Sequence, residues 1–560
     1  MLVEPGRGLS ARLLRGVIVR KRIGILVIHG VGEQTQFEYL EAIAGNLFKA
    51  LSQDPARKPQ IQIRRGAQAP LHAPTESWQS APAIVSWWSQ ETHRWIDAHF
   101  HEVTWADLDM PSTLTNWLRL VGWGLAMPGI KLVDSTRTFQ AREQHVCLPI
   151  RLSVVRRFFV RLELFGVSLL FFLMLTSINM LSWVLRRLAI RFTPIEHARV
   201  IIYDYLGDVK LYQDWTIRDD GLEALGEKSR ASIQRRALRA LATMAGEVQH
   251  KRLDEYYIFA HSLGTVVAFN ALMELGVTLP NHFNEEEWAA LPATLKTHAG
   301  YDAPEPQKPR RPYWLGKRDA IDRSVLFAGL KGLLTMGSPL NKFAAMWPAI
   351  VPVNREALAQ PVPWINVADR QDIVAGDRIS LFRSCDDRAP DDIAGLRLRN
   401  MPWADRLSIF TAHTSYWKAD LTPSNPLGRI QGQLTGRHRQ RLMNCLIPWL
   451  ETGDGRRFEP PDDRMPGWLA ASVYCAWLAI IALALSFIPA FLLRWMEILW
   501  SGGDAAIQHS LWEAMIATIK NPSLLAMHMG AVILTGILTV GVCSVIRYAW
   551  EANRDKWTDT

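Results

Sequence analysis

The sequence predicts an α/β domain, with a mainly parallel sheet flanked by helices, together with transmembrane helices. Short stretches rich in β-branched and aromatic residues alternate with helical stretches, which is the pattern of parallel strands joined by crossover helices. Three runs contain no Asp, Glu, Lys or Arg, over residues 164–185, 465–493 and 521–546. Each run is long enough to cross about 30 Å of hydrocarbon as a helix. A hydrophobic share of 49% and a mean hydropathy near zero agree with a soluble domain joined to membrane segments.

The α/β part is expected to begin near the amino terminus and to continue beyond residue 400. The predicted strands are Ile23–His29, Glu102–Trp105, Ile258–Ala260, Gly332–Met336, Trp364–Val367 and Ser408–Thr411. Helices are expected over Phe37–Leu51 and Leu222–His250. The stretch 276–323 breaks this alternation with several prolines among charged residues, so we expect an inserted loop there. The loop is either a lid or an excursion without a role.

The motif Ala260-His261-Ser262-Leu263-Gly264 lies between an apolar strand and a helix of small and apolar residues. A serine at such a sharp turn presents its hydroxyl as a nucleophile, and the turn leaves room only for small residues two positions to either side. Gly264 supports the turn in this way, and Ala260 stands where glycine is more usual. The motif predicts Ser262 as a nucleophile. A serine that caps a core helix is the alternative.

A second motif, His29-Gly30-Val31-Gly32, follows the first predicted strand. Backbone N–H groups in such a turn can face a cavity, and His29, Gly30 and Gly32 would support the turn. The N–H groups of Val31 and of Leu263 would then stabilise a developing oxyanion. A simple glycine-rich turn is the alternative. A dinucleotide-binding fingerprint is not expected, because no third glycine opens a helix after Gly32.

Candidates for an acid and a base follow two further predicted strands. Asp369 and Asp372 come directly after the strand 364–367, and His413 lies in a polar turn after the last strand. His413 would take the proton from Ser262. The order nucleophile, acid, base along the chain is that of α/β-hydrolases, whereas chymotrypsin-like and subtilisin-like proteases use other orders.

Taken together, these motifs resemble the lipase and esterase branch of the α/β-hydrolase superfamily over roughly residues 23–102 and 200–449. The resemblance implies the α/β-hydrolase fold and hydrolysis of an ester through an acyl-enzyme, without a cofactor. It also favours Asp372 over Asp369 as the acid, because Asp372-Ile373-Val374 resembles the acid, apolar residue and valine of the family. The turn Gly337-Ser338-Pro339 resembles the end of the strand that follows the nucleophile in many lipases.

The apolar runs divide the chain into parts. We expect the two parts of the α/β-hydrolase domain at 1–157 and 191–452, an apolar membrane insertion at 158–190, two transmembrane helices within 465–546 and a basic tail at 547–560. His29 and Ser262 must share one folded domain although the insertion lies between them. The insertion must therefore cross the membrane an even number of times or not at all, as a re-entrant segment, a hairpin or a surface helix.

Composition also bounds the compartment and the partners. The five cysteines form no CxxC pair and share no spacing with histidines, so neither a zinc site nor a disulfide framework is expected. The net charge is +9, and the basic residues are scattered or flank the apolar runs. This distribution favours anionic lipid headgroups over nucleic acid as the binding partner. We expect an integral protein of a bacterial-type inner or other cytosol-facing membrane, with the catalytic domain in the cytosol and a lipid-like ester as substrate. A catalytically inert membrane scaffold with the same fold is the alternative.

Overall fold

The computed structural model describes the greater part of the α/β region. It covers residues 20–30, 37–63, 83–105, 146–147, 212, 230–299, 311–369 except 349 and 357, 372, 374–375, 379, 382, 392–403, 413, 416 and 442–459. Several predicted features lie outside these residues: Val31, Gly32, the strand Ser408–Thr411, the insertion 158–190, the helices 465–493 and 521–546, and the tail 547–560.

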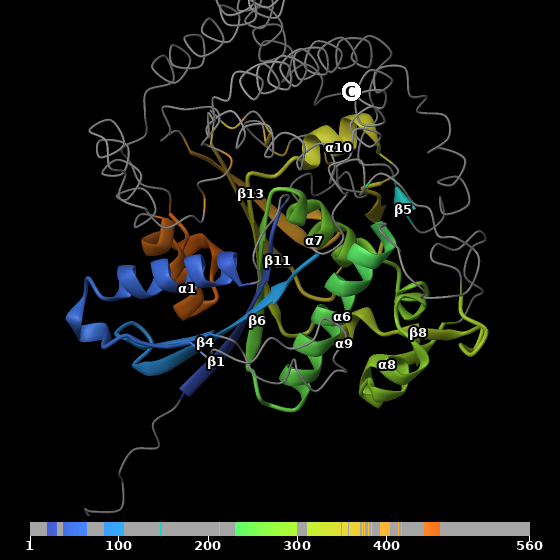
Figure 1. Cartoon of the computed structure of the whole chain (residues 1–560), viewed down its shortest axis with the longest axis horizontal. Coiled ribbons are helices and arrows are strands. Elements are labelled where there is room, and N and C mark those ends of the chain that lie inside the picture. Colours follow the sequence, from blue (N-terminus) through green and yellow to red (C-terminus); the bar gives the residue numbers. More distant parts are fainter. Residues whose placement is uncertain are drawn as a thin grey trace, which may run out of the picture.

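A nine-stranded sheet forms the centre of the described structure, in the order β12-β13-β11-β9-β6-β1-β4-β3-β2 (Figure 1). All neighbouring pairs from β13 to β4 are parallel. Toward the two edges the pairs are antiparallel, namely β12 with β13, β3 with β4, and β2 with β3. The expected mainly parallel sheet is therefore confirmed. The strands are β1 (Arg20–Ile28), β2 (Gln60–Ile63), β3 (Ala83–Ser89), β4 (Arg94–Val103), β6 (Glu255–His261), β9 (Leu330–Met336), β11 (Val362–Asp369), β12 (Asp392–Ile393) and β13 (Leu396–Trp403).

Helices cover both faces of this sheet, as Figure 1 shows. Helix α1 (Glu38–Leu51) and the helical residues 442–452, drawn in orange, share one buried apolar cluster with the sheet. On the other face lie α6 (Arg230–Gln249), α7 (Leu263–Met273), α9 (Arg323–Leu326) and α10 (Leu340–Met346). In β1, Ile25 packs toward α1 and Leu26 toward α6 and α7. Both faces of β1 are thus buried, which explains its nearly unbroken apolar sequence.

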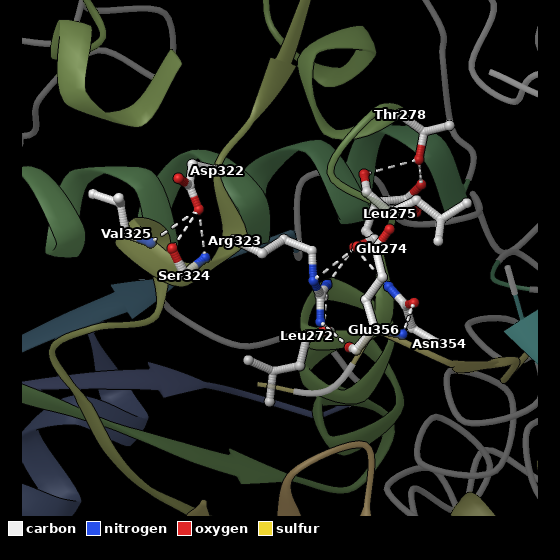
Figure 2. A network of polar contacts seen from close by, with 10 residues as sticks. All are labelled: Leu272, Glu274, Leu275, Thr278, Asp322, Arg323, Ser324, Val325, Asn354 and Glu356. Carbon is white, nitrogen blue, oxygen red and sulfur yellow. Dashed lines mark hydrogen bonds and ion pairs between the residues drawn. The ribbon is translucent and has the colours of Figure 1, made fainter. Parts of the chain in front are cut away.

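The insertion 276–323 packs along α6. Its described elements are η5 (Leu279–His282), α8 (Glu285–Ala290), η6 (Ala293–Leu295), β7 (Lys296–His298) and β8 (Asp319–Ile321). Its two ends meet where the Ile321 N–H donates to the Gly276 carbonyl at 2.9 Å. Buried Arg323, at the start of α9, donates to carbonyls at the end of α7, including that of Leu272 at 3.0 Å (Figure 2). The insertion therefore leaves from the carboxyl end of α7, whereas Ser262 lies directly before the amino end of the same helix.

The remaining described elements are η1 (Pro55–Arg57), β5 (Val146–Cys147), β10 (Val353–Asn354) and η7 (Gly455–Arg457). Cys147 pairs with Val353 across the small sheet of β5 and β10, and it is disulfide-bonded, whereas Cys445 is a free thiol. The sequence spacing predicted no disulfide framework, and the structure adds one bonded cysteine, Cys147, whose partner lies outside the described residues. Spacing along the chain does not reveal which distant segments meet, and a disulfide requires such a meeting.

No helix among the described residues is long and apolar enough to cross a membrane. The three apolar runs that carry the membrane prediction lie outside these residues, so the membrane part of the architecture stays a prediction.

Candidate active site

The carboxyl ends of three neighbouring strands bring the predicted motifs together. In the register of the sheet, Ile28 of β1 lies beside Ala260 of β6, and His261 lies beside Met336 of β9. The Ser262 N–H donates to the Met336 carbonyl at 3.0 Å. The turn after β1, the serine after β6 and the Gly-Ser-Pro turn after β9 therefore lie at one edge of the sheet, although the sequence separates them widely.

Ser262 has a strained backbone. Its φ of 52° and ψ of −131° lie in a region that side-chain-bearing residues rarely adopt. The strain arises because β6 ends at His261 and α7 begins at Leu263, so the chain reverses within one residue. Thr265 stabilises the turn, because both its N–H, at 3.0 Å, and its hydroxyl, at 2.7 Å, donate to the Ser262 carbonyl.

Close packing around this turn explains the need for small residues. A Cβ atom placed on Gly264 would collide with the carbonyl oxygen of His29, and one placed on Gly30 would collide with the Cβ of Ser262. A carbonyl oxygen and a Cβ atom are both fixed by the backbone and cannot move away as the end of a flexible side chain can. Glycine at these two positions therefore lets the turn after β1 approach the serine.

Ser262, His413 and Asp372 form a continuous chain of hydrogen bonds. The Nε2 atom of His413 lies 2.6 Å from the Ser262 Oγ, and its Nδ1 lies 2.9 Å from the Asp372 Oδ2. All three side chains are buried. Because Nδ1 faces a carboxylate, it carries the proton, and Nε2 is left to accept the serine hydroxyl. This arrangement can transfer a proton from Ser262 to His413.

The Asp372 carboxylate is held by hydrogen bonds at both oxygens. Oδ1 accepts the N–H groups of Val374 at 2.8 Å and Ala375 at 3.1 Å, while Oδ2 accepts from His413 and, at 3.2 Å, from the Tyr416 hydroxyl. Burial raises the pKa of Asp372, but His413 and these backbone donors outweigh burial and lower the pKa below its usual value. Asp372 therefore stays ionised.

Asp369, the rival acid, ends β11 and is also buried. Its backbone N–H donates to the Tyr416 hydroxyl at 2.7 Å, and the Asp372 N–H donates to the Asp369 carbonyl at 2.9 Å. In the structure it is thus Asp372 whose carboxylate contacts His413, while Asp369 contributes backbone groups to the same turn.

The turn after β1 is fixed through the ring of His29. The Trp105 N–H donates to His29 Nε2 at 3.3 Å, so Nδ1 carries the proton and donates to the Gly30 carbonyl at 2.7 Å. The rings of His29 and Trp105 stack with centroids 4.1 Å apart. The segment directly after β4 thus orients the first residues of the predicted oxyanion turn. Val31, which would supply one N–H, lies outside the described residues.

The other predicted donor, the N–H of Leu263, is the first in α7. The first N–H groups of an α-helix have no partner within the helix, and the helix dipole adds partial positive charge there. A negatively charged oxygen beside Ser262 would be stabilised at this position.

Three residues around His413 had no role assigned from the sequence: His261, Gly337 and Tyr416. His261 Nε2 donates to the His413 carbonyl at 2.9 Å, and burial, reinforced by His413, lowers the pKa of His261 to about 3, so it stays neutral. Gly337 has a φ of +58°, and a Cβ there would press on Tyr416, Asp372 and His413. The only local signals were the Gly-Ser-Pro turn and the histidine beside the nucleophile.

Among the described residues, no group of three or more His, Cys, Asp or Glu side chains is arranged to hold a metal ion. Comparison of the chain with models of known protein families, with curated proteins and with solved structures finds no match. The case for a function therefore rests on the geometry of this site.

Proposed function

We propose that this protein is a serine hydrolase of the α/β-hydrolase type that cleaves an ester. The observation that supports the proposal most is the hydrogen-bond chain from Ser262 Oγ through His413 to Asp372, with separations of 2.6 and 2.9 Å. It starts at a serine with a strained backbone between a strand and a helix. Strain of this kind persists only where the surrounding structure holds it in place, and it is concentrated at active sites.

In the proposed reaction, Ser262 Oγ attacks the ester carbonyl while His413 Nε2 takes the hydroxyl proton. His413 then gives this proton to the leaving alkoxide, and an acyl group stays on Ser262. Water, deprotonated by His413, releases the acid and restores the serine. Asp372 holds the proton on Nδ1 and stabilises the imidazolium that forms twice in each cycle. The N–H groups of Leu263 and Val31 would stabilise the tetrahedral oxyanion.

Covalent labelling tests the nucleophile. A fluorophosphonate probe should label the wild-type protein, and Ser262→Ala should abolish both labelling and ester hydrolysis. Ser89→Ala is a matched control, because Ser89 is a buried serine at the end of β3, at the opposite edge of the sheet. It should be labelled like the wild type. A folded wild-type protein that resists the probe would instead support the inert scaffold.

We also propose that the ester is lipid-like and that the protein is anchored in a membrane. The support is the three apolar runs, two of which, 465–493 and 521–546, follow the α/β domain directly. An anchored domain meets substrates that partition into the bilayer. A series of esters of graded acyl length, offered in detergent micelles, should show kcat/KM rising with chain length. A preference for acetyl esters would contradict the lipid-like substrate.

The cytosolic placement of the domain is a proposal that Cys147 can test. Disulfides are rare in reducing compartments, so the Cys147 disulfide of the structure and a cytosolic domain predict opposite states of this residue. Intact cells are quenched in denaturing acid, and the free thiols are then alkylated and identified by mass spectrometry. Cys147 should be found as a free thiol if the domain faces the cytosol. An oxidised Cys147 in these cells would place the domain on the oxidising side.

A further inference from the structure

Tyr416 contacts the acid of the candidate triad from within the same turn as the base. It follows His413 by three residues, and its ring is buried beside His261, with centroids 5.5 Å apart. Its hydroxyl lies 2.7 Å from the Asp369 nitrogen and 3.2 Å from Asp372 Oδ2. Oδ2 is the same oxygen that accepts the hydrogen bond from His413 Nδ1.

The directions of these hydrogen bonds follow from the donors present. The Asp369 N–H can only donate, so the phenol oxygen accepts from it. Burial, reinforced by the charges of Asp372 and Asp369, raises the pKa of Tyr416 well above its usual value, so the hydroxyl keeps its proton. That proton is then donated to Asp372 Oδ2, in competition with His413 for the charge on this oxygen.

We propose that Tyr416 is a positioning residue that limits how strongly Asp372 holds the protonated His413, an inference that rests on the proposed hydrolase function. A donor on Oδ2 withdraws negative charge from the carboxylate and fixes its rotation. Without this donor, Asp372 would stabilise the imidazolium more strongly, and His413 would be protonated at a higher pH. Less of His413 would then be unprotonated at neutral pH and able to accept the Ser262 proton, and its ring would be oriented less firmly.

Other ionisable groups lie around Tyr416 and the Asp372–His413 pair, and the test must leave them unchanged. They are His261 at the end of β6, His29 directly after β1, which acts on His261, and Asp369 at the end of β11, which acts on Tyr416. His261 stays neutral because burial lowers its pKa to about 3. Tyr416→Phe removes one oxygen and changes none of these ionisable side chains, although the Asp369 N–H loses the hydroxyl as its acceptor. A change in the pH profile therefore reports on the hydroxyl and its two hydrogen bonds.

The experiment is the pH dependence of kcat/KM for wild type and Tyr416→Phe in the full-length, detergent-solubilised protein. The acidic limb should move to higher pH by about one unit, the effect expected when a carboxylate loses one hydrogen bond. At neutral pH kcat should fall about tenfold, with KM within about twofold of wild type. An unmoved acidic limb with unchanged kcat would overturn the proposal, whether or not the melting temperature of the variant changes.

Tyr257→Phe is the matched control. Tyr257 is also buried, and its hydroxyl donates to the Glu255 carboxylate at 2.8 Å, at the far end of β6 from Ser262. This variant should lose stability and keep the wild-type pH profile. An equal shift of the acidic limb in Tyr257→Phe would show that the loss of any buried hydroxyl causes it, and would overturn the proposal.

A double-mutant cycle tests whether Tyr416 acts through Asp372. In an Asp372→Asn background, Tyr416→Phe should change the rate of fluorophosphonate labelling by less than about twofold, because the carboxylate it acts on is gone. The same fold-loss in both backgrounds would overturn the proposal. If Tyr416→Phe does not fold, 3,5-difluorotyrosine at position 416 replaces it. This stronger donor should move the acidic limb to lower pH, and an unmoved limb would again overturn the proposal.

The proposed hydrolase function and the role of Tyr416 would be contradicted by different results. If the wild-type protein is not labelled at Ser262, the hydrolase function itself fails. If the wild type is labelled and the Tyr416 variants match it, the hydrolase function stands and only the role of Tyr416 is lost.

Discussion

Asp372→Asn is the substitution for which the structure predicts the largest effect from the smallest change in shape. The N–H groups of Val374 and Ala375 donate to Oδ1, so the amide oxygen of an asparagine must take that place. Its NH₂ group then faces Nδ1 of His413, where the carboxylate oxygen accepts a hydrogen bond at 2.9 Å. Two donors cannot share this contact, so His413 must carry its proton on Nε2.

A proton on Nε2 removes the acceptor for the Ser262 hydroxyl, which lies 2.6 Å away. The wrong tautomer in a serine triad costs about 10⁴-fold in kcat, or about 5 kcal/mol of transition-state stabilisation. We therefore expect kcat of Asp372→Asn to fall by about 10³ to 10⁴-fold with KM nearly unchanged. Steady-state hydrolysis of a chromogenic ester, with active sites counted by burst titration, measures this.

Asp369→Asn is the matched control for this prediction. Asp369 contributes its N–H and carbonyl to the turn, and the substitution keeps both. We expect kcat within about fivefold of wild type. A loss in Asp369→Asn that equals or exceeds the loss in Asp372→Asn would refute both the tautomer argument and the choice of acid.

Three further predictions concern stability and packing. Burial raises the pKa of Glu102 from 4.5 to about 8, so between these pH values the folded state binds more protons than the unfolded state. Stability should therefore fall with rising pH by up to about 4–5 kcal/mol. Glu102→Gln should flatten this dependence in urea titrations, because glutamine can still accept the Phe37 N–H; a parallel decline in both proteins would contradict it. Arg323→Met leaves buried carbonyls at the end of α7 unpaired and should cost about 3 kcal/mol of stability, with the labelling rate of the folded protein unchanged. Gly264→Ala should abolish fluorophosphonate labelling, because the added methyl group would collide with the His29 carbonyl; normal labelling would show that the turn tolerates it.

Strands in the middle of the sheet were predictable from sequence, and strands at its edges were not. β1, β6, β9 and β11 are buried on both faces, so each reads as a short apolar run. β13 carries Arg397, Arg399 and Asn400 among its apolar residues and gave no such signal. Of β4, only its last residues were predicted, because polar residues such as Asp97 and His99 interrupt it.

The predicted site residues came from local patterns, and the structure places those it describes side by side. Ser262 was recognisable because a reversal of the chain between strand and helix requires small neighbours, which leave a mark in the sequence. His413 and Asp372 were recognisable only from their order and from the strands before them. Asp369 and Asp372 stand at or just after the end of the same strand, and only the resemblance of Asp372-Ile373-Val374 to the family pattern favoured Asp372.

The sequence by itself thus determined the alternation of strands and helices, the nucleophilic turn and the apolar runs, because each depends on residues that are close together in the chain. Tertiary structure alone showed the contact between the Asp372 carboxylate and His413, the disulfide of Cys147, and the hydrogen bonds from Tyr416 and His261. These contacts join segments whose separation in space is set by the packing of the whole sheet. A hydrogen bond depends on position to within a few tenths of an ångström, and such precision arises only once distant strands have paired.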